Sequence, residues 1–104
     1  MDSVPNGGRF DGALGVVAAF EVLQTIRESG TRLKVNLEAM DFTDEEGTLV
    51  GLLGSAAIAG HLKQKDLDAP RGGRENLVEG MKSASLSDAS LLSAARPKES
   101  FAGY

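Results

Sequence analysis

Apolar residues recur at close to helical spacing between Gly12 and Ser29, and this periodicity predicts a helix over that segment. The repeating positions are Leu14, Val17, Ala18, Val22 and Ile26, with further apolar residues between them. An apolar face this wide is typical of a helix that packs on a sheet. Glu28 and Ser29 are followed by Gly30, which predicts that the helix ends there with Gly30 just beyond its last turn.

The segment from Val35 to Phe42 alternates between apolar and polar residues through most of its length, and strict alternation predicts a strand. The acidic sequence Thr43-Asp44-Glu45-Glu46-Gly47 follows directly. Because acidic residues form strands poorly, the strand is expected to end here, with the carboxylates at its C-terminal edge. Upstream, the sequence Pro5-Asn6-Gly7-Gly8 predicts a loop.

The second half of the chain predicts short helices separated by loops. Helices are expected at Gly54–Leu62, with Ser55 near the start, at Asn76–Ser83, and at Asp88–Ala95, capped by Ser87 and ended by Pro97; Lys63–Glu75 is expected to be an exposed loop. The order of elements predicts an α/β fold. A single strand would keep two unpaired edges, so we expect residues 1–104 to be one partial domain with an incomplete mixed sheet flanked by helices.

Composition and charge exclude several classes of function. The 104 residues are 41% hydrophobic and 25% charged, with a formal net charge of −4 and no cysteine. Acidic and basic residues are interspersed without a basic stripe, which argues against nucleic-acid binding, and the lack of cysteine excludes disulfides and thiolate metal sites. The longest apolar run is too short to span a bilayer, and no signal peptide is visible. We therefore expect a cytoplasmic protein with no membrane partner.

The carboxylates that could carry chemistry also have ordinary interpretations. Asp11 lies at a loop-to-helix boundary, where Asp commonly caps a helix or forms a turn; alternatively, it could bridge two metal ions. The Glu45–Glu46 pair would usually be a solvated turn. However, the pair follows a predicted strand, where sites collect in open α/β sheets, and two neighbouring carboxylates there can divide metal binding and proton transfer between them.

The other candidates are weaker when taken from the sequence alone. Asp2 lies too near the terminus to interpret without help. His61 is the only histidine, and a single His without an acidic neighbour is more often a surface or packing residue than a metal ligand. The glycines form no phosphate-binding fingerprint, and no serine or cysteine nucleophile motif is present.

Two segments resemble a known family. The sequence from Asp2 to Val16, DSVPNGGRFDGALGV, resembles the first metal-site segment of the hydantoinase/carbamoylase-type metal-dependent amidohydrolases, and FTDEEG at Phe42–Gly47 resembles the second. The sequence LGSAAIAG at Leu53–Gly60 is similar to the helix that follows. This family includes N-carbamoyl-L-amino-acid hydrolase, β-ureidopropionase and allantoate amidohydrolase, and is related to the dinuclear zinc exopeptidases. The resemblance extends over essentially the whole chain.

The resemblance implies a role for each candidate residue. Asp11 matches the carboxylate that bridges two divalent ions (Zn, Mn, Ni or Co), and Glu46 matches a ligand of one of them. Glu45 matches the general base that activates the attacking water, while Asp2 matches the carboxylate that orients a metal-binding His. The implied reaction is hydrolysis of a ureido or amide C–N bond in a small-molecule substrate, by a parent enzyme that is a homodimer.

Several family features lie outside these residues, and this leaves alternatives open. The metal-binding His before Asp2 would precede Met1, a further His segment would follow Tyr104, and Ala56 stands where the family usually has Arg. Two carboxylates without imidazoles should hold transition metals weakly or not at all, so we expect the chain alone to be inactive. The alternatives are a truncated non-catalytic remnant or binding module, part of a related metallopeptidase, or a small metalloprotein that takes ligands from a second copy.

Overall fold

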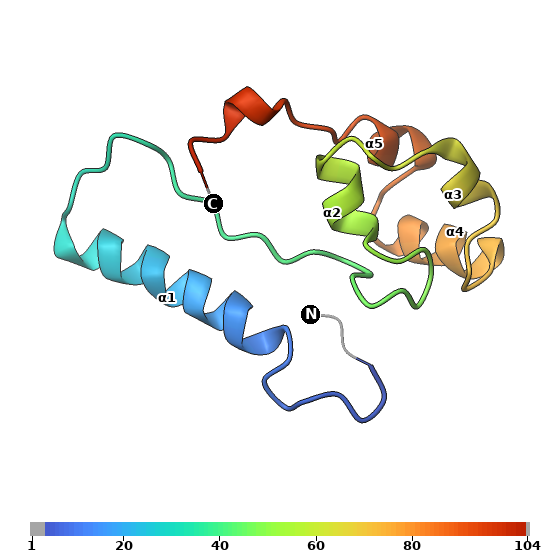
Figure 1. Ribbon diagram of the computed structural model, residues 1–104, viewed down its shortest axis with the longest axis horizontal. Coiled ribbons are helices and arrows are strands. Elements are labelled where there is room, and N and C mark those ends of the chain that lie inside the picture. Colours follow the sequence, from blue (N-terminus) through green and yellow to red (C-terminus); the bar gives the residue numbers. More distant parts are fainter. Residues whose placement is uncertain (1–3, 104) are drawn as a thin grey trace. The chain divides into compact units, whose positions relative to one another are not determined.

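The computed structural model describes residues 4–103, which belong to two compact units, residues 1–41 and residues 42–104 (Figure 1). Each unit is described by itself. Asp2 lies outside the described residues. None of the helices in residues 4–103 combines the length and the apolar character needed to cross a lipid bilayer.

The first unit is built on one long helix, α1 (Ala13–Ser29). Its end is as predicted: Gly30 adopts the left-handed conformation, with φ of 67°, and its N–H donates to the carbonyl of Arg27. Its start differs from the simplest expectation, because Gly12 is the N-cap and no side chain caps the helix. Asp11 instead takes part in the preceding turn, in which its N–H donates to the carbonyl of Gly8.

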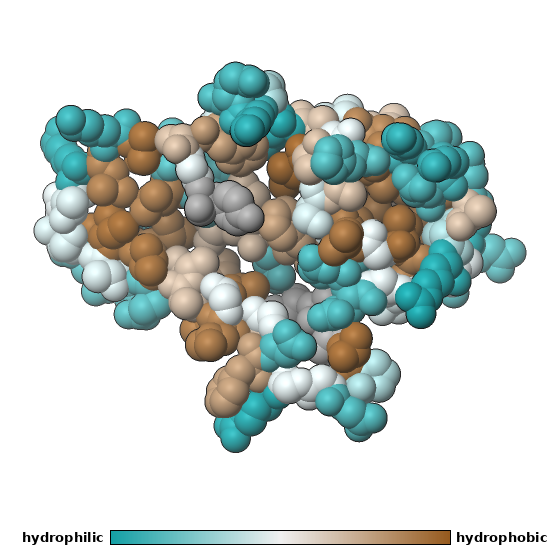
Figure 2. Space-filling model, in the orientation of Figure 1, coloured by the Kyte–Doolittle hydropathy of each residue, from teal (hydrophilic) through white to brown (hydrophobic). Residues whose placement is uncertain are grey.

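Hydrophobic side chains cover much of the surface of α1. One face, formed by Ala13, Val16, Ala19, Leu23 and Ile26, is half-buried, but Leu14, Val17, Phe20 and Val22 are each more than half exposed and no residue of α1 is fully buried. Figure 2 shows this apolar surface in brown over the helix. Residues 13–20 of α1 are all apolar, whereas its later turns also carry exposed polar side chains such as Glu21, Gln24 and Glu28. A helical segment that is apolar on all sides is typical of an element enclosed by other elements.

The predicted strand at Val35–Phe42 is not formed, and no strand occurs in residues 4–103. The segment is irregular, and Val35 and Leu37 are exposed. A strand needs a hydrogen-bonded neighbour, and the rest of the described first unit consists of turns and one helix. The alternating pattern is therefore present without the sheet that it predicts.

The second unit contains four α-helices and a short 3₁₀ helix among its described residues. They are α2 (Leu53–Ile58), α3 (Gln64–Asp68), α4 (Arg74–Ser83), α5 (Asp88–Leu92) and η1 (Lys98–Ser100). The predicted helix at Asn76–Ser83 is confirmed, beginning two residues earlier than expected. The helix predicted at Asp88–Ala95 is shorter than expected and ends well before Pro97, but Ser87 caps it as predicted, accepting a hydrogen bond from the N–H of Ser90 at 3.2 Å.

Two local expectations for this unit are wrong. The segment Lys63–Glu75 is not simply an exposed loop, because it contains α3, whose Leu67 is fully buried. The helix predicted at Gly54–Leu62 is formed as α2, with Ser55 near its start and Leu52 as its N-cap, but it extends only to Ile58. The same helix ends early, because Gly60 adopts φ of 71° and the N–H groups of Gly60 and His61 turn back to the carbonyls of Ala57 and Ala56.

The core of the second unit is small and lies where the four α-helices meet. Leu53, Leu67, Leu77 and Met81 are buried, one from α2, one from α3 and two from α4. Leu91 and Leu92 of α5 pack on them from outside. Since fully burying one such side chain contributes about 1.5–3 kcal/mol, each of these residues carries a large share of the stability of the unit.

Arg74 joins three helices of this unit. Its guanidinium donates two hydrogen bonds to the carboxylate of Asp88, at 3.0 and 2.8 Å, and one to the carbonyl of Leu67 at 3.2 Å. Gln64 also donates to Asp88, at 3.1 Å. The Arg74 guanidinium and the Gln64 amide hold the pKa of Asp88 below its ordinary value.

We expect Asp88→Asn to destabilise the second unit at pH 7 and to lose this effect in acid. A carboxyl group with a lowered pKa stabilises the fold above its unfolded pKa of about 3.9, and this contribution disappears as the pH falls through the lower folded value. Because the Arg74 side chain is 38% exposed, the loss should be about 1 kcal/mol or less.

Denaturant unfolding followed by helical circular dichroism at pH 7 and at pH 3 measures this difference. Glu79→Gln, an exposed change on α4, is the matched control and should behave like the unchanged chain. Equal stability of the Asp88→Asn chain and the unchanged chain at pH 7 would contradict the prediction.

Candidate active site

The three described candidate residues lie on the surface of the two units. Asp11 is exposed in the first unit, just before α1, whereas Glu45 and Glu46 are exposed next to each other in the second. Among residues 4–103, no three His, Cys, Asp or Glu side chains gather closely enough to hold a metal ion. The glutamate pair lies on a loop with many hydrogen bonds.

Asp44, which precedes the glutamate pair, is buried, with 6% of its surface exposed. Its Oδ1 accepts a hydrogen bond from the N–H of Leu49 at 2.8 Å. Its Oδ2 accepts two more, from Val50 at 2.6 Å and from Gly51 at 2.9 Å. A buried carboxylate is stable only when it is well hydrogen-bonded, and three backbone amides meet that requirement here.

The next three amides donate to backbone carbonyls at the start of the same loop. Leu52 N–H donates to the Glu45 carbonyl at 3.2 Å, Leu53 N–H to Asp44 at 3.3 Å and Gly54 N–H to Thr43 at 3.0 Å. The first N–H groups of a helix have no partner inside the helix, and α2 satisfies these with residues 43–45. Six consecutive amides, residues 49–54, therefore converge on the backbone and side chain of Thr43, Asp44 and Glu45.

We call residues 43–52 the acidic loop. Two of its non-glycine residues, Asp44 and Leu52, have positive φ values of 54° and 53°. Asp tolerates this conformation better than most residues, whereas Leu adopts it rarely. Such backbone conformations cost about 1–3 kcal/mol and persist only where the surrounding contacts enforce them. Here the hydrogen bonds donated by the six backbone N–H groups enforce them.

Glycines let the acidic loop close tightly on itself and on its neighbours. A Cβ on Gly47, whose φ is 81°, would lie 3.4 Å from the Cα of Gly51, and one on Gly54 would lie 2.9 Å from the backbone nitrogen of Thr43. Gly72 approaches the loop from outside: its N–H donates to the Leu49 carbonyl at 2.8 Å, and a Cβ there would collide with the carbonyl oxygen of Thr48. Backbone thus packs on backbone on both sides of the loop.

The result is a fixed backbone that carries two exposed carboxylates. The peptide groups on either side of Glu45 are held, one through the Asp44 carbonyl and the other through its own carbonyl. The guanidinium of Arg71 also lies beside the loop, with Nη1 3.7 Å from the position of a Cβ on Gly47. Fixed, neighbouring carboxylates of this kind can take separate roles in metal binding and proton transfer.

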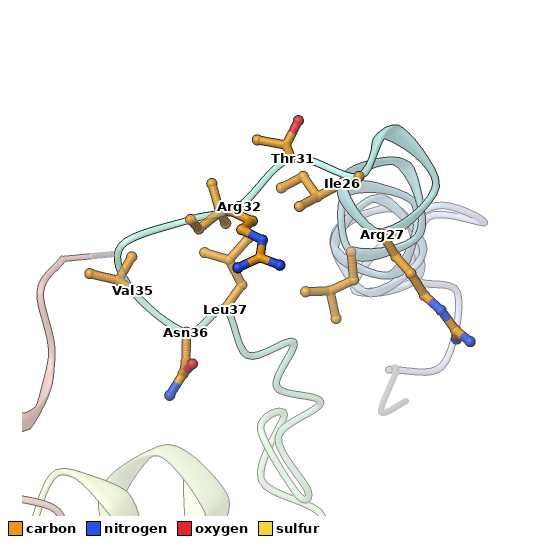
Figure 3. A pocket seen from close by; sticks show the side chains of 10 residues that line it. Ile26, Arg27, Thr31, Arg32, Val35, Asn36 and Leu37 are labelled. Atoms are coloured by element: carbon orange, nitrogen blue, oxygen red, sulfur yellow. The ribbon is translucent and has the colours of Figure 1, made fainter.

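Two pockets of the structure have linings that do not include these carboxylates. An open pocket of about 530 Å³ in the first unit lies between the end of α1 and the segment that follows it; Figure 3 shows Ile26, Arg32 and Leu37 among its lining residues. A second pocket, of about 400 Å³, lies in the other unit beside Gly51 and includes His61 and Arg71. Neither pocket is lined by Asp11, Glu45 or Glu46.

Sequence reasoning missed Asp44. Its neighbours Glu45 and Glu46 drew attention because they resemble a family motif, and Asp44 was placed with them at the expected end of a strand. A signal was nevertheless present, since Asp before a glycine-containing loop commonly accepts hydrogen bonds from backbone N–H groups a few residues later. The glycines at 47 and 51 indicate such a loop.

Comparison with known proteins finds that the chain is similar to one protein family and to several named hydrolases. Residues 1–72 match peptidase family M28. Over its whole length the chain is 42% identical to the N-carbamoyl-L-amino acid amidohydrolase of Geobacillus stearothermophilus, of which it covers 26%. It is 37% identical to the allantoate amidohydrolase of Bacillus subtilis (strain 168), over 68% of this chain and 18% of that protein. With the ureidoglycolate hydrolase of Arabidopsis thaliana the identity is 40%, over 58% of this chain and 13% of that protein.

The chain spans about a quarter or less of the length of these curated relatives. No solved structure matches it. The similarity to the Geobacillus stearothermophilus protein extends from end to end of this chain, so it includes the segments that contain Asp11, Glu45 and Glu46.

The packing around the acidic loop leads to a prediction for two glycine substitutions. Gly72→Ala should destabilise the second unit by about 1–3 kcal/mol, because the added methyl group collides with the backbone at Thr48 and Leu49. Gly80→Ala, inside α4 where an added Cβ meets nothing within 4 Å, should instead stabilise it by about 0.5–1 kcal/mol.

Denaturant unfolding of the two variants beside the unchanged chain tests the pair. The opposite signs are the informative result, since both substitutions add the same methyl group. If Gly72→Ala leaves the free energy of unfolding unchanged, Gly72 does not lie as close to Thr48 and Leu49 as the structure shows.

Proposed function

Because this chain belongs to peptidase family M28, we propose that it forms part of a metal-dependent hydrolase that cleaves ureido or amide C–N bonds. Its substrates would be N-carbamoyl amino acids or allantoate-like compounds, the substrate classes named for several of its relatives. The observation that carries this proposal is the exposed Glu45–Glu46 pair on a hydrogen-bonded loop, within a chain that is similar along its full length to an N-carbamoyl-L-amino acid amidohydrolase.

The proposal gives each carboxylate a separate task. Glu45 accepts a proton from the attacking water and delivers it to the nitrogen that leaves, as a general base and then a general acid. Asp11 and Glu46 are metal ligands, and Asp2 orients a metal-binding His of the complete site. The exposure of Glu45 and Glu46 supports these roles, because both side chains can reach a substrate or an ion.

The described residues do not by themselves form a complete metal site. Asp11 and Glu46 are two oxygen donors, and no group of three possible donors is present in residues 4–103. Divalent ions in such enzymes lower the pKa of bound water and polarise the carbonyl that is attacked. In this proposal the imidazole ligands, which suit ions such as Zn and Ni, come from other parts of the complete enzyme.

We further propose that the chain is a partial catalytic domain of the α/β zinc-exopeptidase type. Family membership supports this architecture, and the alternating pattern of Val35–Phe42 fits a strand that forms once neighbouring strands are present. The wide apolar surface of α1 fits a helix packed against such a sheet.

A metallopeptidase is the second candidate, because the matching family is named for peptidases. The two functions differ in the bond that is cleaved. Release of ammonia from a carbamoyl group supports the first, whereas release of an amino acid from an unblocked dipeptide supports the second.

The proposed activity predicts hydrolysis by the chain within its complete reading frame but not by the 104 residues alone. Two carboxylate ligands should be too few to hold the metal ions. Ammonia release from N-carbamoyl-L-amino acids and from allantoate is measured with Zn, Mn, Ni and Co, after chelator treatment and after metal is restored. Activity that withstands complete metal removal, or reproducible hydrolysis by the 104 residues alone, would overturn this part of the proposal.

Glu45→Gln in the active protein should lower kcat by about 100-fold or more while the metal content stays unchanged, because the proton acceptor is lost and the ligands remain. Glu46→Gln should lower the metal content as well. Glu79→Gln on α4 is the control for loss of an exposed carboxylate and should be fully active. A Glu45→Gln protein with unchanged kcat would rule out the assigned base.

A further inference from the structure

Asp44 is the one buried charged or polar residue in the part of the chain that the structure describes. Its carboxylate accepts three hydrogen bonds, from backbone amides that come five, six and seven residues later. Such an arrangement closes the chain on itself and leaves the carboxylate no open side on which to bind substrate. Its contribution must therefore be made through the residues that it holds.

The residues enclosed by these bonds include the glutamate pair. Glu45 follows Asp44 directly, and the carbonyl of Glu45 accepts the Leu52 N–H. The left-handed conformation of Asp44, with φ of 54°, sets the direction in which the chain leaves toward Glu45. The side chain of Asp44 and the two backbone bonds thus fix the Cα–Cβ direction of Glu45 together.

The same bonds connect the acidic loop to the hydrophobic core. Leu49 and Val50, whose amides donate to Asp44, pack against the buried cluster of Leu53, Leu67, Leu77 and Met81. Core packing resists displacement. Through the Asp44 carboxylate, the packed core therefore also restrains the backbone at the exposed residue Glu45.

We propose that Asp44 is a positioning residue for Glu45: its carboxylate holds the acidic loop so that the Glu45 side chain is presented in one direction for proton transfer. This proposal rests on the role assigned to Glu45 above. Catalytic groups must be placed closely, and a displacement of about 1 Å can reduce the rate by about 100-fold.

Asp44→Asn is the informative substitution because it keeps the size of the side chain and removes part of its bonding. An amide side chain has one acceptor oxygen, whereas the carboxylate uses both oxygens for three N–H donors. In either orientation the Asn NH₂ group faces at least one backbone N–H. The loop should therefore loosen without a large change in packing volume.

Two measurements test the proposal. Hydrogen exchange in the 104-residue chain should show the amides of residues 49–54 exchanging at least 10-fold faster in the Asp44→Asn variant than in the unchanged chain, with the amides of α4 unaffected. In the active protein, the same substitution should lower kcat by about 10- to 100-fold, with KM and metal content changed little.

A second variant separates positioning from loss of stability. Gly80→Ala stabilises α4, far in sequence from the loop, and is combined with Asp44→Asn. If Asp44 only supports folding, the double variant regains the activity of the unchanged protein; if Asp44 positions Glu45, kcat stays low although stability is restored. Gly80→Ala alone is the matched control and should be fully active.

The outcomes are distinct. Unchanged exchange at residues 49–54, or recovery of kcat in the double variant, overturns the positioning role. If the unchanged protein hydrolyses none of the tested ureido compounds, the proposed function fails and the catalytic role of Asp44 fails with it. The exchange measurement then still decides whether Asp44 holds the loop.

Discussion

Six consecutive backbone amides, residues 49–54, donate to three consecutive residues, Thr43–Glu45, and the acidic loop and the start of α2 both depend on this convergence. It starts α2 without a side-chain cap, because the N–H groups that a helix leaves unpaired are used to hold the loop. It also satisfies a buried carboxylate that would otherwise be costly. The same hydrogen bonds thus satisfy both the free N–H groups at the start of α2 and the buried carboxylate of Asp44.

The two units obtain their order from different sources. The second has a small apolar core, to which four helices contribute or attach, and an ion pair that ties Arg74 to Asp88. The first consists of a long helix with no fully buried residue. Long regular helices form from local preferences and hydrogen bonds within the helix, but most helical stability in proteins comes from packing an apolar face. The first unit therefore leaves much of the apolar surface of α1 exposed.

Sequence reasoning succeeded where the determining interactions are local. The body of α1, the left-handed Gly30 at its end and the Ser87 cap of α5 each depend on residues within one or two turns, and periodicity and capping rules describe them directly. It failed where distant residues decide the outcome. The helix at Gln64–Asp68 has only Leu67 as a large apolar residue, and contacts with other helices bury it. The strand predicted at Val35–Phe42 needs a partner that no local pattern supplies. The candidate glutamates were found through a resemblance, but Asp44 required knowledge of which amides the chain brings back to it.

In the acidic loop, the residues that set the backbone conformation differ from the residue that carries the proposed reactive group. Its conformation is set by the Asp44 side chain, by backbone groups and by glycines that no larger residue can replace without displacement. The exposed side chain of Glu45 has no part in those backbone bonds. In evolutionary terms, the loop backbone and this reactive group can change independently: Glu45 could be exchanged for another functional group without the loss of those backbone bonds. Descendants of such a sequence could then acquire a new specificity or lose catalysis altogether while remaining recognisable by their glycines and by Asp44.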